Sequence, residues 1–179
     1  KVTLNGHEFS TFTNADGSIY HLNLHPEDIA DHIILVGDRD RVAMISRHFD
    51  HIDTKKSKRE FVTHTGEYQG VRCTALSTGI GVGNIDIVMN ELDALCNIDL
   101  KSKTLHPTLR ALNIIRFGTC GTCSPDIDID SLSISHHAIG FDGALNFYHR
   151  TLSEIDSQFQ SAVLQQLAGL PCYDAIYTA

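Results

Sequence analysis

The sequence contains no apolar run long enough to cross a membrane, and its amino end lacks the pattern of a secretory signal. Positive charge is also scarce, because 14 Lys and Arg stand against 22 Asp and Glu, a formal net charge of -8. Such a surface repels a nucleic-acid backbone overall. The five cysteines are an odd number and form no framework of a small secreted protein. We therefore expect a cytoplasmic protein with reduced thiols and with neither membrane nor nucleic acid as a partner.

The composition is that of a globular α/β protein. At 179 residues with 42% hydrophobic side chains, the chain suits a single domain with a sizeable core. Buried strands are predicted at 32–36, 71–77 and 112–117. Each ends in a glycine-containing loop, which indicates a layered α/β sheet. Because ligands of such folds lie beyond the carboxyl ends of the strands, three loops become candidates for a site: 37–41, 79–84 and 118–122.

The rest of the pattern completes a coarse assignment. Further strands are predicted at Ser18–Leu22, Arg59–Thr65, Ser131–Ser135, His137–Ile139 and Tyr173–Thr178. Helical spacing covers residues 40–48, a segment with Ile87, Val88, Leu92 and Leu95 on its apolar side, and Ile155–Ala168. Residues 97–111 are polar and interrupted by Pro107, which is typical of a loop.

The first candidate loop carries an arginine at the start of a predicted helix. Gly37 allows the backbone to approach a ligand closely, and the start of a helix offers N–H groups to an anion. Arg41 lies where the helix dipole disfavours a cation, so its position is best explained by an anion nearby. A surface ion pair with Asp38 or Asp40 is the alternative.

The third candidate loop follows a strand that ends in a charge. Arg116 lies at the end of a predicted buried strand, where an unpaired charge would be costly. It therefore needs a carboxylate or a bound oxyanion as partner, and an internal ion pair remains an open alternative. Thr119 adds a hydroxyl donor, and Gly118 exposes its backbone amide.

Two other sequence patterns predict neither a dinucleotide site nor a metal site. The run Gly79–Gly83 fails as a dinucleotide fingerprint, because Asn84 stands where the third glycine belongs, so we interpret it as a tight turn near a ligand. The CxxC of Cys120 and Cys123 has no second ligand pair at zinc spacing. His136 and His137 fall on or beside a predicted strand, where their rings should face opposite sides. No metal site is expected from these groups.

Taken together, the motifs resemble the uridine phosphorylase branch of the nucleoside phosphorylase family. The likeness rests on five segments in order: Val36–Val42, Arg59–Phe61, Ser77–Gly81, Ile115–Gly121 and Phe141–Ala144. It runs from about Ser18 to the last residue. The resemblance implies a three-layer phosphorylase-type fold, with a central mixed, twisted sheet flanked by helices. It also implies that residues 1–179 form one phosphorylase-like domain, whose base-reading residues would follow Ala179, so that we expect the chain to be incomplete at its carboxyl end.

Carried onto this sequence, the resemblance implies a phosphate site made by Gly37, Arg41, Arg116, Gly118 and Thr119. Ile80 would lie beside the ribose. Arg59 would complete the phosphate site from a neighbouring subunit, and His21 would reach a neighbour's site to meet the 5′-hydroxyl of the sugar. Such sharing requires a homodimer, or a hexamer built from dimers.

Two departures from the family concern the same loops. Glu60 and the Ile80 carbonyl match positions that hold a monovalent cation between subunits in some members, but Asn84 replaces the serine at the third position. Only a weak cation candidate is therefore implied. Arg39 stands where the family usually has proline.

The implied reaction is phosphate-dependent cleavage of the N-glycosidic bond of a nucleoside, preferably uridine-like, to free base and ribose 1-phosphate. Inorganic phosphate is the co-substrate and no cofactor is implied. Arginine grips phosphate bidentately, which would fix the nucleophile against a cationic sugar. A purine phosphorylase or a nucleosidase of the same superfamily is an alternative, although water as nucleophile needs no converging arginines. A non-catalytic fragment that binds phosphate or nucleoside is the other alternative.

Overall fold

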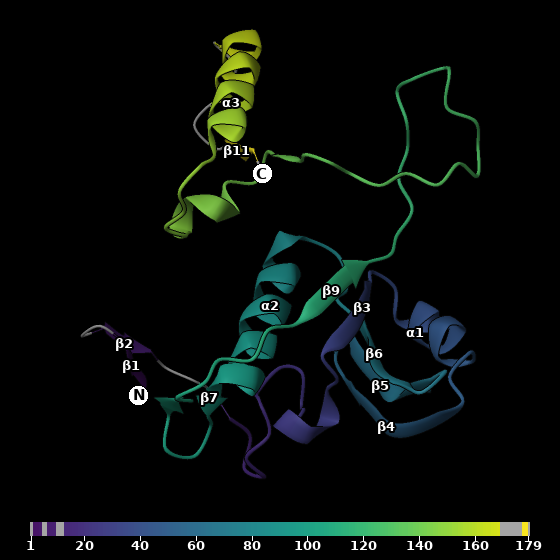
Figure 1. The fold of residues 1–179 in the computed structure, drawn as a ribbon, viewed down its shortest axis with the longest axis vertical. Coiled ribbons are helices and arrows are strands. Elements are labelled where there is room, and N and C mark those ends of the chain that lie inside the picture. Colours follow the sequence, from purple (N-terminus) through teal and green to yellow (C-terminus); the bar gives the residue numbers. More distant parts are fainter. Residues whose placement is uncertain (1, 5–6, 10–12, 169–176, 179) are drawn as a thin grey trace. The chain divides into compact units, whose positions relative to one another are not determined.

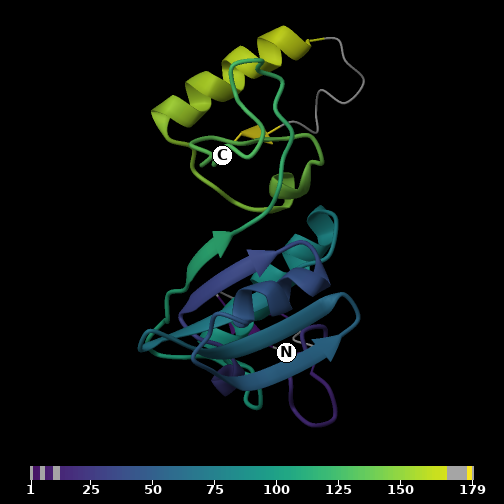
Figure 2. The same cartoon turned by 90° about the vertical axis from the view of Figure 1, so that its right-hand side faces the viewer.

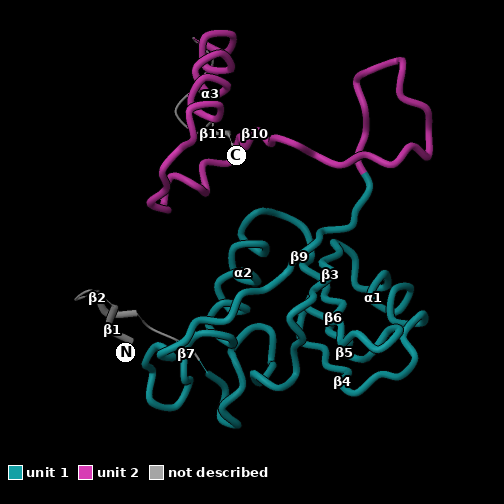
Figure 3. Tube along the Cα trace, viewed as in Figure 1, with its two compact units in different colours: residues 1–119 teal, residues 120–179 magenta. Residues whose placement is uncertain are grey.

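The computed structural model describes residues 2–4, 7–9, 13–168 and 177–178. The chain divides into two compact units, residues 1–119 and residues 120–179 (Figure 3). Unit 1 contains β1 (Val2–Leu4), β2 (His7–Phe9), η1 (Pro26–Asp28), β3 (His32–Val36), α1 (Arg39–Ser46), β4 (His51–Lys58), β5 (Phe61–Tyr68), β6 (Val71–Ser77), α2 (Val82–Asn97), β7 (Ile98–Asp99), β8 (Thr104–Leu105) and β9 (Asn113–Arg116) (Figure 1). Unit 2 contains β10 (Ile139–Gly140), η2 (Ala144–Phe147), α3 (Glu154–Leu167) and β11 (Tyr177–Thr178).

Unit 1 is built on a five-stranded mixed sheet in the order β4-β5-β6-β3-β9 (Figure 2). Strand β3 runs parallel to both β6 and β9, whereas β5 runs antiparallel to both β4 and β6. In the register, Val36 pairs with Ser77, and Leu35 pairs with Arg116. The carboxyl ends of the three parallel strands therefore meet at one edge, and the predicted mixed α/β sheet is confirmed.

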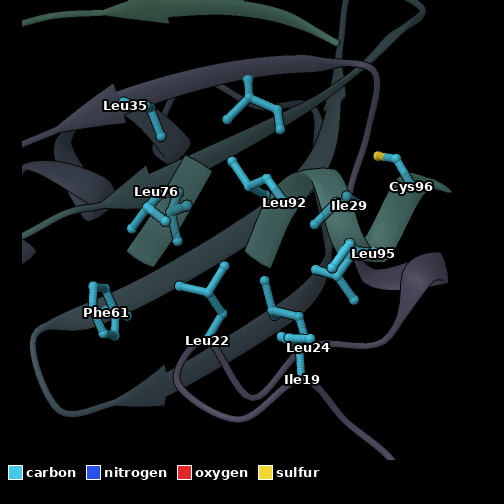
Figure 4. Close-up of a cluster of buried hydrophobic side chains, with 13 residues drawn as sticks. Ile19, Leu22, Leu24, Ile29, Leu35, Phe61, Leu76, Leu92, Leu95 and Cys96 are labelled. Carbon is cyan, nitrogen blue, oxygen red and sulfur yellow. The ribbon is translucent and has the colours of Figure 1, made fainter. Parts of the chain in front are cut away.

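Helices α1 and α2 pack on opposite faces of this sheet. Leu76 of β6 belongs to the core cluster that contains Leu92 of α2 (Figure 4). Its neighbour Ala75 packs with Val42 of α1 in a separate cluster. Successive side chains of a strand point to opposite faces, so the two helices must lie on different sides. Full burial of each leucine contributes roughly 1.5–3 kcal/mol. The result is the three-layer arrangement that the sequence predicts.

The predicted strand Ser18–Leu22 is wrong. Ile19 forms only an isolated bridge with Thr13, and the chain then turns. The side chain of Asn14 donates to the Ile19 carbonyl at 2.9 Å and to Ser18 Oγ at 2.9 Å. Such local bonds from an asparagine offer the backbone an alternative to strand pairing.

Strand β4 is absent from the sequence prediction, and the strand predicted at Arg59–Thr65 begins too early. Residues 51–58 alternate between exposed and half-buried, and charged side chains such as Lys55 occupy this edge of the sheet. A charged edge strand has no apolar face, so it lacks the alternation of apolar and polar side chains from which a strand is predicted. Arg59 and Glu60 instead form the two-residue turn into β5, with Arg59 at a φ of 55°.

The remaining strand predictions fail in part. Residues 97–111, predicted to be a loop, contain the short β7–β8 hairpin. Ser131–Ser135 is not a strand, although its residues alternate; Leu132 and Ile134 are 82% and 88% exposed. Of His137–Ile139 only Ile139 is in a strand, paired with Thr178. Most of the predicted strand Tyr173–Thr178 lies outside the described residues. Helix α3 agrees with the predicted helix.

Candidate functional site

A cavity of about 710 Å³ opens at the carboxyl ends of the parallel strands β3, β6 and β9. Its lining consists of Gly37, Asp38, Arg39, Arg41, Glu60, Gly79, Ile80, Asn84, Arg116, Gly118 and Thr119. Each of the three loops selected from the sequence contributes to this lining. The predicted meeting of these loops at one edge of the sheet is therefore confirmed.

Backbone hydrogen bonds extend the sheet just past the strands and hold the loops together. The Thr78 amide donates to the Val36 carbonyl at 2.8 Å, and the Phe117 amide donates to the Leu35 carbonyl at 2.8 Å. The loops that begin at Gly37, Gly79 and Gly118 therefore start side by side. Their geometry follows from the parallel register and not from contacts within any one loop.

Three arginines line the cavity: Arg39 and Arg41 at the start of α1, and Arg116 at the end of β9. Arg116 lies closest to the glycines: a Cβ added to Gly118 would be 3.2 Å from Nη1, and one added to Gly37 would be 3.7 Å from Nη2. Arg39, which in the sequence is only a departure from the family, lines the same cavity and donates to Ser57 Oγ at 3.0 Å. Its place two residues before Arg41 is the feature of the sequence from which this role could have been predicted.

The two alternatives to an anion partner find no support in the described residues. Within residues 13–168, Arg41 forms no ion pair with Asp38 or Asp40, and Arg116 forms none with any carboxylate. The prediction that Arg116 ends a buried strand is nevertheless wrong. β9 lies at the edge of the sheet, Ile115 is 68% exposed, and Arg116 itself is exposed.

The start of α1 differs from expectation in one respect. The Asp38 carboxylate caps the helix and accepts a hydrogen bond from the Asp40 amide at 2.9 Å. This backbone donor is consequently already used, although the sequence predicted it to be open to an anion. The cap occupies one backbone donor of the first turn, and the guanidinium groups supply the side-chain positive charge that lines the cavity.

The loop after β6 is a tight turn packed against Glu60. Gly79 has a φ of +71°, and a Cβ there would lie 2.7 Å from Asn84 Nδ2 and 2.9 Å from Glu60 Cγ. Asn84 Nδ2 donates to the Ile80 carbonyl at 3.1 Å. In the candidate cation site of Glu60, Ile80 and Asn84, the carbonyl oxygen therefore already accepts a hydrogen bond from the third member.

His21 and Arg59 do not line this cavity, but they lie close to each other. The ring of Tyr20 is 4.8 Å from that of His21, in an edge contact, and 6.0 Å from the Arg59 guanidinium carbon. Lys58 Nζ also lies 4.6 Å above the Tyr20 ring. We call these four residues the Tyr20 patch. The two residues that the resemblance assigns to a neighbouring subunit thus share one surface outside their own chain's cavity.

A second hollow, of about 570 Å³, lies beside α1. Its walls are mainly apolar side chains, among them Met44, Phe49 and Phe117, although Arg41 and Thr119 line it too. An apolar hollow does not suit an anion, which would lose its hydration without compensating donors. The cavity with three arginines is therefore the candidate site for phosphate.

No group of three or more His, Cys, Asp or Glu side chains is placed to hold a metal ion in the part of the chain that the structure describes. Cys120 and Cys123 are exposed free thiols. The rings of His136 and His137 do not face opposite sides, because this segment is not a strand; their Nδ1 atoms are 2.9 Å apart. The described residues also contain no helix that is long and apolar enough to cross a membrane.

Comparison with protein families identifies the chain. The model of the phosphorylase superfamily matches residues 31–173. The chain belongs to the phosphorylase superfamily. The matched range includes all three cavity loops, so the candidate site lies in the part of the sequence that defines the superfamily.

Relatives within the phosphorylase superfamily include uridine phosphorylases and purine nucleoside phosphorylases. The chain is 34% identical over 135 residues to a uridine phosphorylase of Thermococcus kodakarensis, covering 75% of this chain and 44% of the relative. It is 35% identical over 129 residues to a uridine phosphorylase of Treponema pallidum, covering 72% and 45%. A DeoD-type purine nucleoside phosphorylase of Caldanaerobacter subterraneus is 32% identical over 127 residues, covering 70% and 49%.

Among solved structures, a nucleoside phosphorylase of Trypanosoma brucei described as showing uridine phosphorylase activity superimposes with a TM-score of 0.85. It is 32% identical, and the match covers 95% of this chain and 57% of that one. The fold of the superfamily is therefore present. The chain spans about half the length of the curated relatives it matches.

Proposed function

We propose that this protein is a nucleoside phosphorylase that cleaves uridine or a similar nucleoside with inorganic phosphate. The observation that carries the proposal is the cavity in which Arg39, Arg41 and Arg116 line the same space as the glycine loops. Planar guanidinium groups bind phosphate through paired N–H donors, which suits a site that must orient an oxyanion. A Cβ at Gly118 would be tight against Arg116 Nη1 at 3.2 Å, whereas one at Gly37 would make an ordinary contact with Nη2 at 3.7 Å.

The chemistry follows from holding phosphate beside the sugar. A phosphate oxygen forms a bond to the anomeric carbon while the bond from that carbon to the base nitrogen breaks. The base leaves with the bonding electron pair and takes a proton from solvent. The transition state resembles the oxocarbenium ion of glycoside hydrolysis, which an adjacent phosphate dianion stabilises. In this proposal Arg41, Arg116 and Thr119 position the nucleophile, and Ile80 borders the ribose.

Uridine is favoured over purine nucleosides by two observations. Two uridine phosphorylases match with 34% and 35% identity, slightly above the 32% of the purine enzyme. The solved structure with a TM-score of 0.85 is described as having uridine phosphorylase activity. Hydrolysis by water is disfavoured because a water nucleophile would not require three arginines in its cavity.

We also propose that the active site is shared between subunits, in a homodimer or a hexamer of dimers. His21 and Arg59 lie outside their own cavity, and each lies near the Tyr20 ring. A surface that presents both residues together could complete the cavity of a neighbour. The reaction needs no cofactor in this proposal, because phosphate positioning and electrostatics carry it.

The proposal includes one phosphorylase domain over residues 1–179, supported by a superfamily match that runs through both compact units. It also includes a cytoplasmic location. The described cysteines, Cys73, Cys96, Cys120 and Cys123, are free thiols, as is typical of a reducing compartment.

The experiment that tests the function is base release by the full-length protein from uridine, thymidine, inosine and adenosine, each with and without inorganic phosphate. Phosphate-dependent release of uracil is the expected result. Preferential release of hypoxanthine or adenine would move the assignment to the purine phosphorylases. Release without phosphate would indicate a nucleosidase, and no release from a folded protein would leave a phosphate-binding protein without turnover.

A further inference from the structure

One carboxylate of helix α2, that of Glu91, makes several polar contacts to His21 of the Tyr20 patch and to the following residue, Leu22. Glu91 accepts hydrogen bonds from the His21 amide, at 3.0 and 3.1 Å to its two oxygens, and from the Leu22 amide at 2.9 Å. Its Oε1 also lies 2.6 Å from Nδ1 of the His21 ring. The Glu91 side chain is 13% exposed. A single carboxylate thus fixes both the backbone and the ring of His21.

The donors around Glu91 determine which ring nitrogen carries hydrogen. Glu91 pairs with no lysine or arginine among the described residues, and the amides of His21 and Leu22 donate to it. A carboxylate that accepts these bonds offers only acceptor oxygens to Nδ1. The short contact therefore requires a hydrogen on Nδ1. In a neutral imidazole the other nitrogen, Nε2, is then an acceptor.

Nε2 itself is not engaged within the described residues. No hydrogen bond to this nitrogen joins it to another described group, and the His21 side chain is 27% exposed. The Tyr20 ring contacts the imidazole edge-on, with centroids 4.8 Å apart and planes at 88°. Glu91 and Tyr20 together restrict the ring, so that one open nitrogen of defined character remains.

We propose that Glu91 is the positioning residue of His21, and that it fixes Nε2 as a hydrogen-bond acceptor for a hydroxyl group of the bound nucleoside. The inference rests on the proposed function, in which His21 meets the 5′-hydroxyl in a neighbour's cavity. A hydroxyl can donate to this nitrogen, whereas a 5′-deoxy sugar offers it nothing. Glu91 therefore contributes to selection of substrates that carry the hydroxyl, without touching them.

The simpler role for Glu91 is to cap the turn at residues 20–22. Such a cap would stabilise the fold but would leave the tautomer of His21 and the choice of substrate unaffected. Glu91→Gln separates the two roles, because its amide nitrogen must face one of the hydrogen-bond donors. Where it faces Nδ1, the ring has to accept the bond and Nε2 becomes the donor. Asp93→Asn, a loss of charge at an exposed position of the same helix, is the matched control.

The first readout is the ¹⁵N NMR spectrum of histidine-labelled full-length protein at alkaline pH, where imidazoles are neutral. We expect His21 to be a single tautomer with hydrogen on Nδ1, and we expect Glu91→Gln to convert it to a mixture. Asp93→Asn should leave the spectrum of His21 unchanged. Persistence of the single tautomer in a folded Glu91→Gln protein would overturn the inference.

The second readout is kinetic and uses uridine and 5′-deoxyuridine. Glu91→Gln should lower kcat/KM for uridine on the order of tenfold, as loss of one good hydrogen bond would, and should leave 5′-deoxyuridine nearly unaffected. The double variant with His21→Ala should be no worse than His21→Ala alone, because Glu91 acts through His21. Equal losses on both substrates would contradict the inference. If the unaltered protein cleaves neither, the proposed function fails, and the tautomer measurement decides the role of Glu91 by itself.

Discussion

The Arg116 guanidinium lies against the backbone of Gly37, where a Cβ would be 3.7 Å from Nη2. The ends of β9 and β3 lie side by side in the sheet, and Arg116 lines the cavity at this edge. Arg116→Lys should therefore weaken phosphate binding, because an ammonium group cannot reproduce the two parallel N–H donors of the guanidinium. The expected loss is about 2 kcal/mol, or roughly thirtyfold in affinity. Phosphate titration by calorimetry measures it.

The control for this variant is Arg47→Lys. Arg47 lies on the C-terminal side of α1 and does not line the arginine cavity. This variant makes the same replacement of a guanidinium by an ammonium group, but outside the cavity. Equal losses of affinity in both variants would mean that the position of Arg116 in the cavity does not govern phosphate binding.

The two glycines at either end of the loop before α2 should respond oppositely to alanine. Gly79→Ala should destabilise the fold by about 1–3 kcal/mol, because φ is +71° and the new Cβ would meet Asn84 and Glu60 at less than 3 Å. Gly83→Ala should be neutral or stabilise by up to about 1 kcal/mol, because Gly83 is helical and nothing lies within 4 Å of an added Cβ. Urea unfolding of both variants tests this contrast; equal stabilities would contradict the structure of the turn.

His64 should make stability depend on pH. Burial, with a smaller effect of Lys55, lowers the pKa of the His64 imidazole below 6.5, and its Nδ1 lies 2.7 Å from buried Ser46 Oγ. The unfolded chain thus takes up the proton first as pH falls. The stabilising contribution is complete above 6.5 and is lost as pH falls toward the lower folded pKa.

Urea unfolding at about pH 8 and about pH 5 measures this contribution. The difference between the two pH values should shrink in His64→Gln. It should persist in His48→Gln, because His48 is an exposed side chain. An undiminished difference in His64→Gln would assign the pH dependence to other groups.

A shared active site predicts complementation between defective subunits. Arg59→Ala and Arg116→Ala should each impair use of phosphate while leaving the unfolding midpoint close to that of the unaltered protein, because both side chains are exposed. Subunits of the two variants, mixed and allowed to exchange, should recover activity at sites that combine an intact Arg59 with an intact Arg116. Purification on two different affinity tags in succession, one tag on each variant, would establish that mixed oligomers form. Mixed oligomers without any recovery would exclude the shared site.

The cavity loops could be predicted from the sequence because their signals are local. A buried run followed by glycine, as at Val36 and Gly37, marks both the strand and the edge at which it ends. Parallel pairing then brings such edges together irrespective of the distance along the chain. The same logic places the segments that carry Arg41 and Arg116 at one edge of the sheet, and the family resemblance assigns both residues to one phosphate site.

Other features depend on contacts that no local pattern encodes. Glu91 is 70 residues from His21, and the sequence alone indicates only that it is one of the polar positions of an amphipathic helix. Strand β4 has charged side chains and no buried face, so its sequence lacks the alternation of apolar and polar residues that predicts a strand. The alternation at 131–135 did give a signal, yet a strand requires a partner, and none of the described residues pairs with it.

The most direct test of the central claim is the ³¹P NMR spectrum of the full-length protein incubated with uridine and inorganic phosphate. The account predicts a growing signal of ribose 1-phosphate, equal in amount to the uracil released and lost in Arg116→Ala. Uracil released while all phosphorus remains inorganic would show that water is the nucleophile, and would contradict the assignment of the arginine cavity to phosphorolysis.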